Sequence, residues 1–336
     1  MSRRAIAIAV ALVVTALIGV AAVAVGLRWA LQPALASAPS TIFDVQPGAS
    51  LGEVARELES RGLIRNAIAL KLLARYRKLD GALQVGEYEV SAALSPDEIL
   101  TRIVEGRVVV YEVVIPEGLR AAQIAPRLEA AGLANAAEFA AFASGPASAG
   151  LLGVEGASLE GYLFPETYRL PRGLSVREVA KVFVDQFLGV WRELEPQARR
   201  QELSMLEVVT LASIVEKETA APDERPLIAS VFRNRLKRGM RLETDPTVIY
   251  GIPNFDGNLR RRDLENAENR YNTYQISGLP PGPIANPGAD ALRAVLNPAE
   301  SEFLFFVSRN DGTHVFSKTY AEHVRAVDKY QRKRSR

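Results

Sequence analysis

The feature that most constrains this chain is an uncharged segment near its N-terminus, Ala5–Leu27, which has 23 residues and consists largely of Ala, Val, Ile and Leu. As a helix rising about 1.5 Å per residue it would be about 34 Å long, enough to cross a hydrocarbon core of about 30 Å. Arg3 and Arg4 precede it, and Arg28 is the one charge that follows closely. The positive-inside bias therefore predicts a cytoplasmic N-terminus and an exported remainder of the chain.

A cleaved signal peptide is the alternative, because Ala34–Ala36 and Ala36–Ala38 resemble small-residue cleavage sites. The apolar segment is, however, longer than the usual signal core of about 7–15 residues. We therefore expect an uncleaved single-pass anchor, with residues 1–4 as a cytoplasmic stub. Residues 28–40, in which Pro, Ala and Ser are frequent, are expected to form a tether.

Composition narrows the chemistry that is open to the exported part. The chain has no cysteine and two histidines, which excludes disulfides, thiolate nucleophiles and sites with several Cys or His ligands. Lys and Arg number 41 and Asp and Glu 39, so the net charge of +2 gives no domain-wide basic field, although the tail 331–336 is locally basic. No phosphate loop or dinucleotide fingerprint occurs. We expect no metal, no cofactor and no nucleic-acid partner.

The first exported region is predicted to mix short strands with helices. Ser50–Glu53 and Ser95–Glu98 fit the capping box that opens a helix. The expected helices run from Ser50 toward Arg61, over Ala67–Leu79, and from Ser95 to Gly106; the expected strands are Thr41–Val45, Val85–Val90 and Arg107–Ile115.

One stretch of this region resembles a later stretch. Val45–Leu63 and Val114–Leu133 share a proline–glycine turn and a helical pattern closed by Gly-Leu, with offsets of 116 − 47 = 69 at the proline and 133 − 63 = 70 at the leucine. A strand–turn–helix unit used twice explains this likeness, and such units more often bind than catalyse. We therefore predict one module over 41–106 and a second module with a junction over 107–153.

Beyond residue 153 the composition changes, and we expect a separate catalytic region over 154–330. Aromatic, Pro and Gly residues collect in Leu159–Tyr168 and in Tyr271–Pro287, a composition typical of rigid cleft walls. His314 alternates with its neighbours like a strand residue, which favours a structural or surface position.

A third capping box, Ser204–Glu207, predicts the start of a helix that ends before Pro222. Its body is almost entirely apolar, and two carboxylates, Glu216 and Glu218, lie at its C-terminal end. The helix dipole and apolar surroundings both disfavour a negative charge there, so both raise a carboxyl pKa. A carboxyl group protonated near neutrality can serve as a general acid.

Glu218 is the better candidate of the two. It shares a stripe with Leu211, Ile214 and Val215, whereas Glu216 lies over Val209, Ala212 and Ser213. A solvated Glu-Lys-Glu cluster at a helix end is the alternative, and the residues alone separate the two glutamates only weakly.

With these features in place, the chain resembles the endolytic murein transglycosylase (YceG-like) family over essentially its whole length. The most specific segments are Glu160–Tyr168, Ala212–Thr219, Asn234–Leu236 with Gly239–Gly251, Tyr271–Tyr274 with Gly278–Ile284, and Asn297–Pro298 before Phe303–Val307. The resemblance implies an α+β protein of the bacterial inner membrane, with a LysM-like region and a lytic domain outside the cytoplasm. It also implies cleavage of peptidoglycan strands between N-acetylmuramic acid and N-acetylglucosamine, with the catalytic glutamate at Glu218.

The chemistry implied by the resemblance needs one carboxyl group. Glu218 would protonate the glycosidic oxygen and then accept the proton of the C6 hydroxyl, which closes a 1,6-anhydro ring without water. Polar residues that could orient the sugars are Glu166, Asp245, Thr247, Tyr271, Asn272 and Gln275, and Tyr168, Tyr250 and Tyr274 offer faces for stacking. Asp245–Pro246 equally fits a turn or a helix cap.

Two other functions stay open at this stage. One is a muramidase that uses water and leaves a reducing end. The other is a non-catalytic peptidoglycan-binding scaffold that recruits cell-wall synthases, which are also the expected protein partners of the enzyme.

Overall fold

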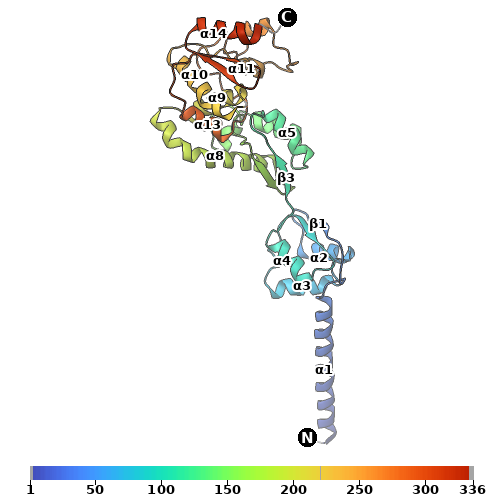
Figure 1. Cartoon of the computed structure of the whole chain (residues 1–336). Helices are drawn as coiled ribbons and strands as arrows, with labels where there is room; N and C mark the ends of the chain where they lie inside the picture. Colours follow the sequence, from blue (N-terminus) through green and yellow to red (C-terminus); the bar gives the residue numbers. More distant parts are fainter. Residues whose placement is uncertain (1–2, 220, 333–336) are drawn as a thin grey trace. The chain divides into compact units, whose positions relative to one another are not determined.

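The computed structural model describes residues 3–219 and 221–332 and divides the chain into two compact units (Figure 1). The first unit ends at Val110 and also contains Pro171–Gly173, and the second contains Tyr111–Leu170 and the chain from Leu174 onwards. The helices are α1 (Arg3–Ala30), α2 (Leu51–Ser60), α3 (Ala67–Tyr76), α4 (Pro96–Val104), α5 (Ala121–Ala130), α6 (Ala136–Ser144), α7 (Ser148–Leu151), α8 (Val176–Arg200), α9 (Met205–Glu218), η1 (Pro222–Glu224), α10 (Arg225–Lys237), α11 (Asp245–Tyr250), α12 (Arg261–Leu264), α13 (Ala289–Leu296), α14 (Tyr320–Val327) and η2 (Asp328–Arg332). The strands are β1 (Thr41–Val45), β2 (Gly86–Val90), β3 (Tyr111–Val114), β4 (Thr167–Leu170), β5 (Phe305–Ser308) and β6 (His314–Ser317).

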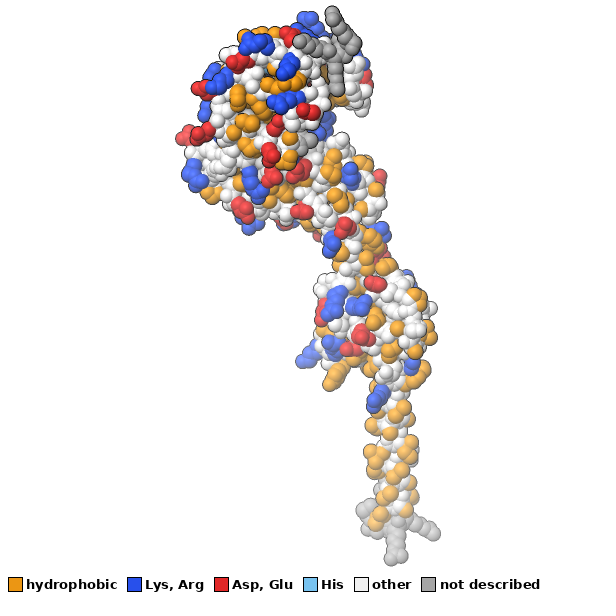
Figure 2. All heavy atoms as spheres, in the orientation of Figure 1, with side chains coloured by type: hydrophobic (Ala, Val, Ile, Leu, Met, Phe, Trp, Pro, Cys, Tyr) orange, Lys and Arg blue, Asp and Glu red, His pale blue; other side chains and the backbone are white. Residues whose placement is uncertain are grey.

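Helix α1 has the length and composition of a membrane-spanning segment. The stretch Ile6–Ala30 contains an 18-residue window with a mean hydropathy of 2.9 and no buried residue, and the orange side chains in Figure 2 cover this helix. Side chains such as Leu12, Val20 and Val25 are therefore exposed rather than packed in a protein core. The helix is apolar and long enough to anchor the chain in a membrane, as the sequence predicts.

The segment after α1 is fastened to the first unit rather than extended freely. The amide of Leu35 donates to the carbonyl of Ala92 at 2.9 Å, and the hydroxyl of Ser91 donates to the carbonyl of Ala38 at 2.8 Å. Arg65 donates to the carbonyl of Trp29 and lies over its indole ring. The expected tether 28–40 has no helix or strand beyond Ala30, but it is held by these contacts.

The predicted repeat extends further than the sequence likeness indicates. The order β1–α2–α3–β2 in the first unit returns as β3–α5–α6–α7–β4 in the second. In each copy the outer strands pair antiparallel, Thr41 opposite Val90 and Tyr111 opposite Leu170. In each copy a glycine with a left-handed backbone, Gly62 (φ +69°) or Gly132 (φ +68°), lies two residues beyond the end of the first helix, a conformation that costs other residues energy.

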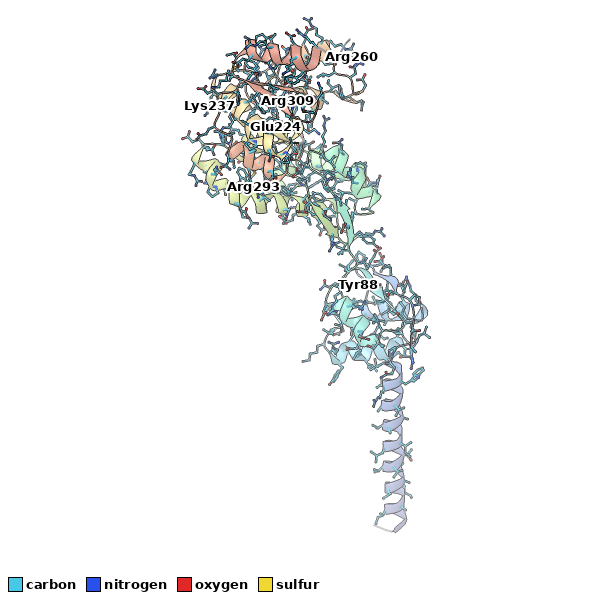
Figure 3. The ribbon with its side chains drawn as sticks, viewed as in Figure 1. Tyr88, Glu224, Lys237, Arg260, Arg293 and Arg309 are labelled. Atoms are coloured by element: carbon cyan, nitrogen blue, oxygen red, sulfur yellow. The ribbon has the colours of Figure 1, made fainter. Side chains whose placement is uncertain are left out.

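The two copies contribute to different hydrophobic cores. The first copy has its own core with α4, built on fully buried residues such as Phe43, Leu58 and Tyr88, the last of which is labelled in Figure 3. The second copy shares one large core with α8, α9, α10 and α13, in which Phe139 and Tyr168 pack against Phe183. The second copy is therefore part of the unit that carries the carboxylate helix.

Two predicted elements are shorter than expected. The strand predicted over Arg107–Ile115 is confined to Tyr111–Val114, because the amide of Val109 bonds to Glu87 of the first unit while β3 pairs with β4. The helix predicted over Ala67–Leu79 ends at Tyr76, and Lys78 has a left-handed backbone (φ +57°) that a helix does not allow.

Helix α9 lies inside the second unit, packed against α8, α10 and α13 (Figure 1). It begins at Met205 behind the predicted Ser204–Glu207 capping box, with both reciprocal hydrogen bonds formed. Every residue from Val208 to Val215 is buried. The helix ends at Glu218, which lines a cavity together with residues of the β5–β6 hairpin and α14.

Candidate active site

Glu218 is the last residue of α9 and lines a cavity of about 430 Å³. The helix ends there because Thr219 has an extended backbone (φ −140°, ψ 138°), fixed by the amide of Ala221 donating to the Thr219 hydroxyl at 2.9 Å. The other walls come from α10, the segment 242–245, Tyr274, the β5–β6 hairpin and α14. An acid at a helix end is thereby presented to a space of the size that small ligands occupy.

The surroundings of Glu218 keep its carboxyl group protonated at higher pH than a free glutamate. Burial raises its pKa to about 7, and the negative charge of Asp245 acts in the same direction. The hydroxyl of Thr244 donates to Oε1 of Glu218, which opposes this rise because it favours the charged form. An acid with a pKa near 7 can give up its proton at neutral pH and take it back, as general acid–base catalysis requires.

Glu216 has a different environment, and its neighbours explain why the two glutamates differ. Its side chain is only 6% exposed, so Glu216 is shielded from solvent even though the residues that precede it on the same helix face are small. Its carboxylate lies 3.0 Å from Arg225 and accepts a hydrogen bond from the amide of Gly288 at 3.1 Å. Arg225 also pairs with Glu117 at 3.1 Å. Glu216 is therefore a structural ion-pair partner.

A second buried acid, Glu160, was not singled out by the sequence. Burial raises its pKa to about 7, but its oxygens accept hydrogen bonds from the amide of Ala121 (3.0 Å), from Asn286 (3.1 Å) and from the hydroxyl of Tyr250 (3.3 Å). Asn286 in turn accepts from the amides of Gly161 and Leu163. This network joins the start of α5 to two loops, so Glu160 supports the fold and has no open oxygen facing a cavity.

Of the predicted sugar-orienting residues, Asp245 and Tyr274 line the cavity with Glu218. The hydroxyl of Tyr274 donates to Oδ1 of Asp245 at 2.8 Å. Thr247 and Asn272 have no exposed surface: Thr247 hydrogen-bonds to Thr244 and Thr273, and the amide of Asn272 donates to three backbone carbonyls between residues 263 and 266.

The remaining predicted residues lie outside this cavity lining. Gln275 donates to the carbonyl of Leu264, and Tyr271 packs against Tyr250, with ring centroids 4.7 Å apart. Tyr168 is buried against Phe183, and its hydroxyl donates to the carbonyl of Phe164. Glu166 is exposed and accepts from the amide of Thr167.

The structure adds cavity residues that the sequence did not indicate. Thr244 contacts Glu218 directly, Arg235 lies over the Phe305 ring, and both histidines, His314 and His323, line the same cavity. His314 is in β6, as its alternation predicts, but it belongs to the cavity wall rather than to a purely structural position. The motif segments Gly239–Gly251 and Asn234–Leu236 were the available signals for Thr244 and Arg235, and nothing local placed the two histidines at the cavity.

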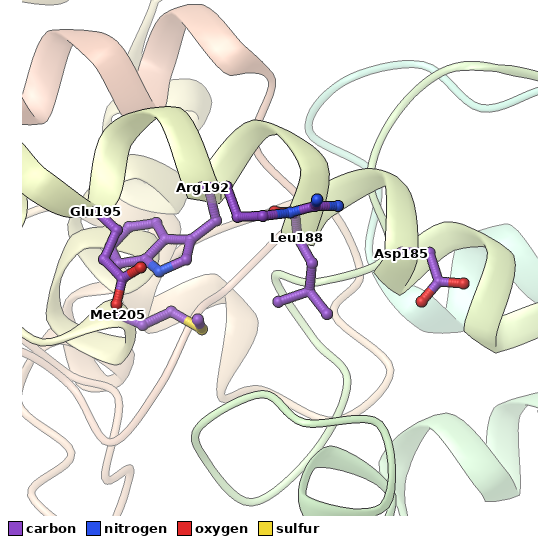
Figure 4. Close-up of a pocket in the computed structure, with 6 residues that line it drawn as sticks. Asp185, Leu188, Arg192, Glu195 and Met205 are labelled. Atoms are coloured by element: carbon purple, nitrogen blue, oxygen red, sulfur yellow. The ribbon is translucent and has the colours of Figure 1, made fainter.

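A larger groove of about 620 Å³ lies along α8 and is lined by Leu188, Trp191 and Met205 together with charged residues (Figure 4). Its carboxylates are exposed and ion-paired, Asp185 with Lys181 at 2.5 Å and Glu195 with Arg199 at 2.6 Å. It offers no desolvated acid, so the Glu218 cavity is the candidate active site. Within the described residues, no group of three or more acidic or histidine side chains could hold a metal ion.

The model of the YceG-like family matches residues 43–329, which include most of both units and every cavity-lining residue except Gln331. The chain belongs to the YceG-like family. The match extends over 85% of the 336 residues (287 of 336), so it does not rest on an isolated motif.

Relatives with assigned names are similar over most of this chain. An endolytic murein transglycosylase of Bacillus subtilis is 29% identical over 317 residues, which cover 89% of this chain and 88% of the relative. One from Streptococcus pneumoniae is 28% identical over 84% of this chain, which spans 57% of that longer protein. The crystal structure of a yceG-like protein from Listeria monocytogenes is 32% identical, with a TM-score of 0.59, covering 86% of this chain and 99% of that one.

Proposed function

We propose that this protein is an endolytic murein transglycosylase that cleaves peptidoglycan glycan strands and uses Glu218 as its acid. The observation that carries the proposal is a single carboxyl group with a pKa raised to about 7 at the wall of an open cavity. The names and the extent of the similar proteins support the same activity.

The first half of the reaction breaks the glycosidic bond. Protonated Glu218 donates its proton to the oxygen that links C1 of N-acetylmuramic acid to N-acetylglucosamine, and the C1–O bond breaks with oxocarbenium character. The leaving sugar departs with a free hydroxyl, and Glu218 is left as a carboxylate. Since Thr244 donates to Oε1, the proton is expected on Oε2, which fixes the direction in which the acid delivers it.

The second half closes a ring within the substrate. The C6 hydroxyl of the same muramic acid attacks C1, and the Glu218 carboxylate takes the hydroxyl proton. The acid is thereby restored, a 1,6-anhydro end is formed and no water is consumed. The nucleophile is already tethered to the reacting carbon, so proximity replaces the second carboxylate that hydrolysing glycosidases need.

We also propose how the protein is placed in the cell. Helix α1 would cross the bacterial inner membrane with its N-terminus in the cytoplasm, since Arg3 and Arg4 precede the apolar segment. The β1–α2–α3–β2 module (41–106) would act as a LysM-like glycan-binding region, followed by a second module and junction (107–153) and the catalytic region (154–330). Cell-wall synthases are the partners expected of an enzyme that trims nascent strands.

One observation favours a second candidate, a hydrolytic muramidase. Asp245 is an exposed carboxylate in the cavity beside Glu218, and a second carboxylate could activate water. The two reactions give products that differ by one water molecule. Mass spectrometry of un-cross-linked glycan strands digested by the purified full chain therefore decides between them: anhydro ends support the transglycosylase, and reducing ends would support the muramidase.

The same experiment separates both enzymes from a non-catalytic scaffold. If the wild-type chain binds strands but releases no fragments under conditions in which it is folded, the scaffold function is favoured. If fragments come only from chain ends, the endolytic part of the proposal fails, because an endolytic enzyme shortens long strands from within.

A further inference from the structure

His314 and Glu224 form a side-chain pair at the cavity that the mechanism above does not use. Nδ1 of His314 lies 2.6 Å from Oε2 of Glu224, and the backbone amide of His314 donates to Oε1 of the same carboxylate at 2.8 Å. Both side chains are nearly buried, with 11% and 15% of their surface exposed. Glu224, labelled in Figure 3, ends η1 six residues after Glu218, so one short segment carries both acids.

The pair fixes which nitrogen of the imidazole carries the proton. A carboxylate can only accept hydrogen bonds, so Nδ1 carries a proton, and whenever the ring holds a single proton Nε2 carries none. Nε2 is then an acceptor. In the described part of the chain no group hydrogen-bonds to Nε2, while His314 lines the cavity and its ring is held edge-to-face on Phe306 at 5.4 Å. The ring is thereby set in place with an unused acceptor.

A fixed acceptor is informative about its ligand. A sugar hydroxyl both donates and accepts, so it can adapt to either tautomer. The N–H of an acetamido group only donates, and a glycan strand of N-acetylated sugars carries one on each sugar. If Nε2 of His314 is held as an acceptor, a hydroxyl can bind whichever tautomer is present, because it can either donate or accept. An acetamido N–H can only donate, so its binding depends on Nε2 staying an acceptor.

We propose that Nε2 of His314 accepts a hydrogen bond from the acetamido N–H of a sugar bound in the Glu218 cavity, and that Glu224 is the positioning residue that holds this tautomer. The inference deepens the proposed function and rests on it for the identity of the ligand. It places the N-acetyl group of one sugar against the β5–β6 hairpin, on the wall that β6 contributes.

Glu224→Gln is the variant that tests the tautomer. The glutamine keeps the shape of the side chain, and its oxygen can still accept from the His314 amide. Its NH₂ group then faces Nδ1 and donates to it, which moves the ring proton to Nε2. Because the chain has two histidines, ¹⁵N NMR of the histidine-labelled full chain in detergent resolves both rings, and His323→Asn identifies the His314 signals.

The same variant tests the ligand. With the proton on Nε2, two N–H groups face each other, and we expect KM for peptide-free glycan strands to rise about tenfold while kcat stays within about twofold. The Kd for the same strands, measured in a Glu218→Gln background, should rise by a similar factor. Glu302→Gln, an exposed glutamate paired with Lys318 before the hairpin, is the matched control and should change none of these values.

Three results would overturn the inference. These are a wild-type His314 protonated on Nε2, a Glu224→Gln variant in which the tautomer does not move, and a moved tautomer with unchanged KM and Kd, which would mean a hydroxyl partner or no contact. Failure of the proposed function has a different signature: the wild type would release no fragments, while the Kd comparison would still test whether His314 contacts the strand.

Discussion

Thr244 and Glu218 are hydrogen-bonded across the cavity, with the threonine hydroxyl donating to Oε1 of the glutamate. Thr244 is the residue before α11 and Glu218 is the last residue of α9, so the contact joins two helix ends. The hydroxyl favours the charged carboxylate, whereas burial and Asp245 favour the neutral acid. The pKa of about 7 is thus a balance between opposing contacts, and each contact can be removed separately.

Glu218→Gln should lower turnover at least about a hundredfold, since the amide cannot deliver a proton. Melting temperature should stay near the wild-type value. Glu216→Gln is the matched control, because it removes the negative charge that is paired with Arg225 instead. We expect that variant to melt several degrees lower and to keep most of its activity per folded molecule. Turnover of glycan strands and thermal melting, measured side by side, check both; a fully active Glu218→Gln variant would exclude this acid.

The pH dependence of kcat/KM should report the acid directly. Activity requires the protonated form of Glu218 and should fall as the pH rises through about 7. Thr244→Val removes the hydroxyl that lowers the pKa, so the alkaline limb should move to higher pH. Asp245→Asn removes a charge that raises the pKa, so the limb should move to lower pH. Shifts of both variants in the same direction would contradict this assignment.

Glu160→Gln should change how stability depends on pH. Glu160 has a pKa of about 7 in the folded chain and of about 4.5 when unfolded, so the folded chain binds the extra proton between these values. The free energy of unfolding therefore falls as the pH rises through this window, by up to about 3 kcal/mol for this group. Glutamine imitates the protonated acid and removes that part of the fall.

Chemical denaturation at pH 5 and pH 8 tests this expectation. The variant should be close to wild type at pH 5 and more stable than wild type at pH 8. Part of the wild-type fall should persist in the variant, since Glu218 contributes in the same direction. An equal loss of stability in the two proteins would show that Glu160 is not protonated in the folded chain.

Removal of the anchor should have different effects at two cut sites. A chain that starts at residue 31 keeps the hydrogen bonds of Leu35 to Ala92 and of Ser91 to Ala38, whereas one that starts at residue 39 loses both. The shorter chain should unfold its first unit more easily, by about 1 kcal/mol for each lost bond. Hydrogen exchange of β1 and β2 measures this difference, and equal protection would show that these contacts contribute nothing.

Both soluble chains should cleave purified strands like the full protein, because the cavity lies in the second unit. If the anchor keeps the enzyme near strands that are being polymerised, neither exported soluble chain should replace the full protein in cells. Full cellular function of a soluble chain would show that the membrane anchor is not needed, which contradicts this part of the proposal.

Local signals in the sequence predicted most elements of the structure. The capping boxes at Ser50, Ser95 and Ser204 open α2, α4 and α9, with their reciprocal hydrogen bonds formed. Such signals depend on residues three apart, so they do not require knowledge of the fold. The valine-rich run before Ile115 was misleading for the same reason, since its local pattern could not show that its two halves bond to different units.

The cavity depends on contacts between distant residues, and these were hidden in the sequence. Glu218 meets Thr244 only after the chain has passed through η1 and α10, and Glu224 meets His314 across 90 residues. Hydrophobic periodicity showed which positions of α9 are buried but could not show that Glu216 finds Arg225. Discrimination between the two glutamates therefore required the positions of their partners.

The two β–α–α–β copies have unequal freedom to change. The first is built around an interior of its own, so a homologous module could be grafted in its place while the Glu218 cavity keeps its neighbours. The second has merged its interior with the helices around α9, and any exchange there would displace the acid. The first copy can therefore change without moving Glu218, whereas the second copy cannot.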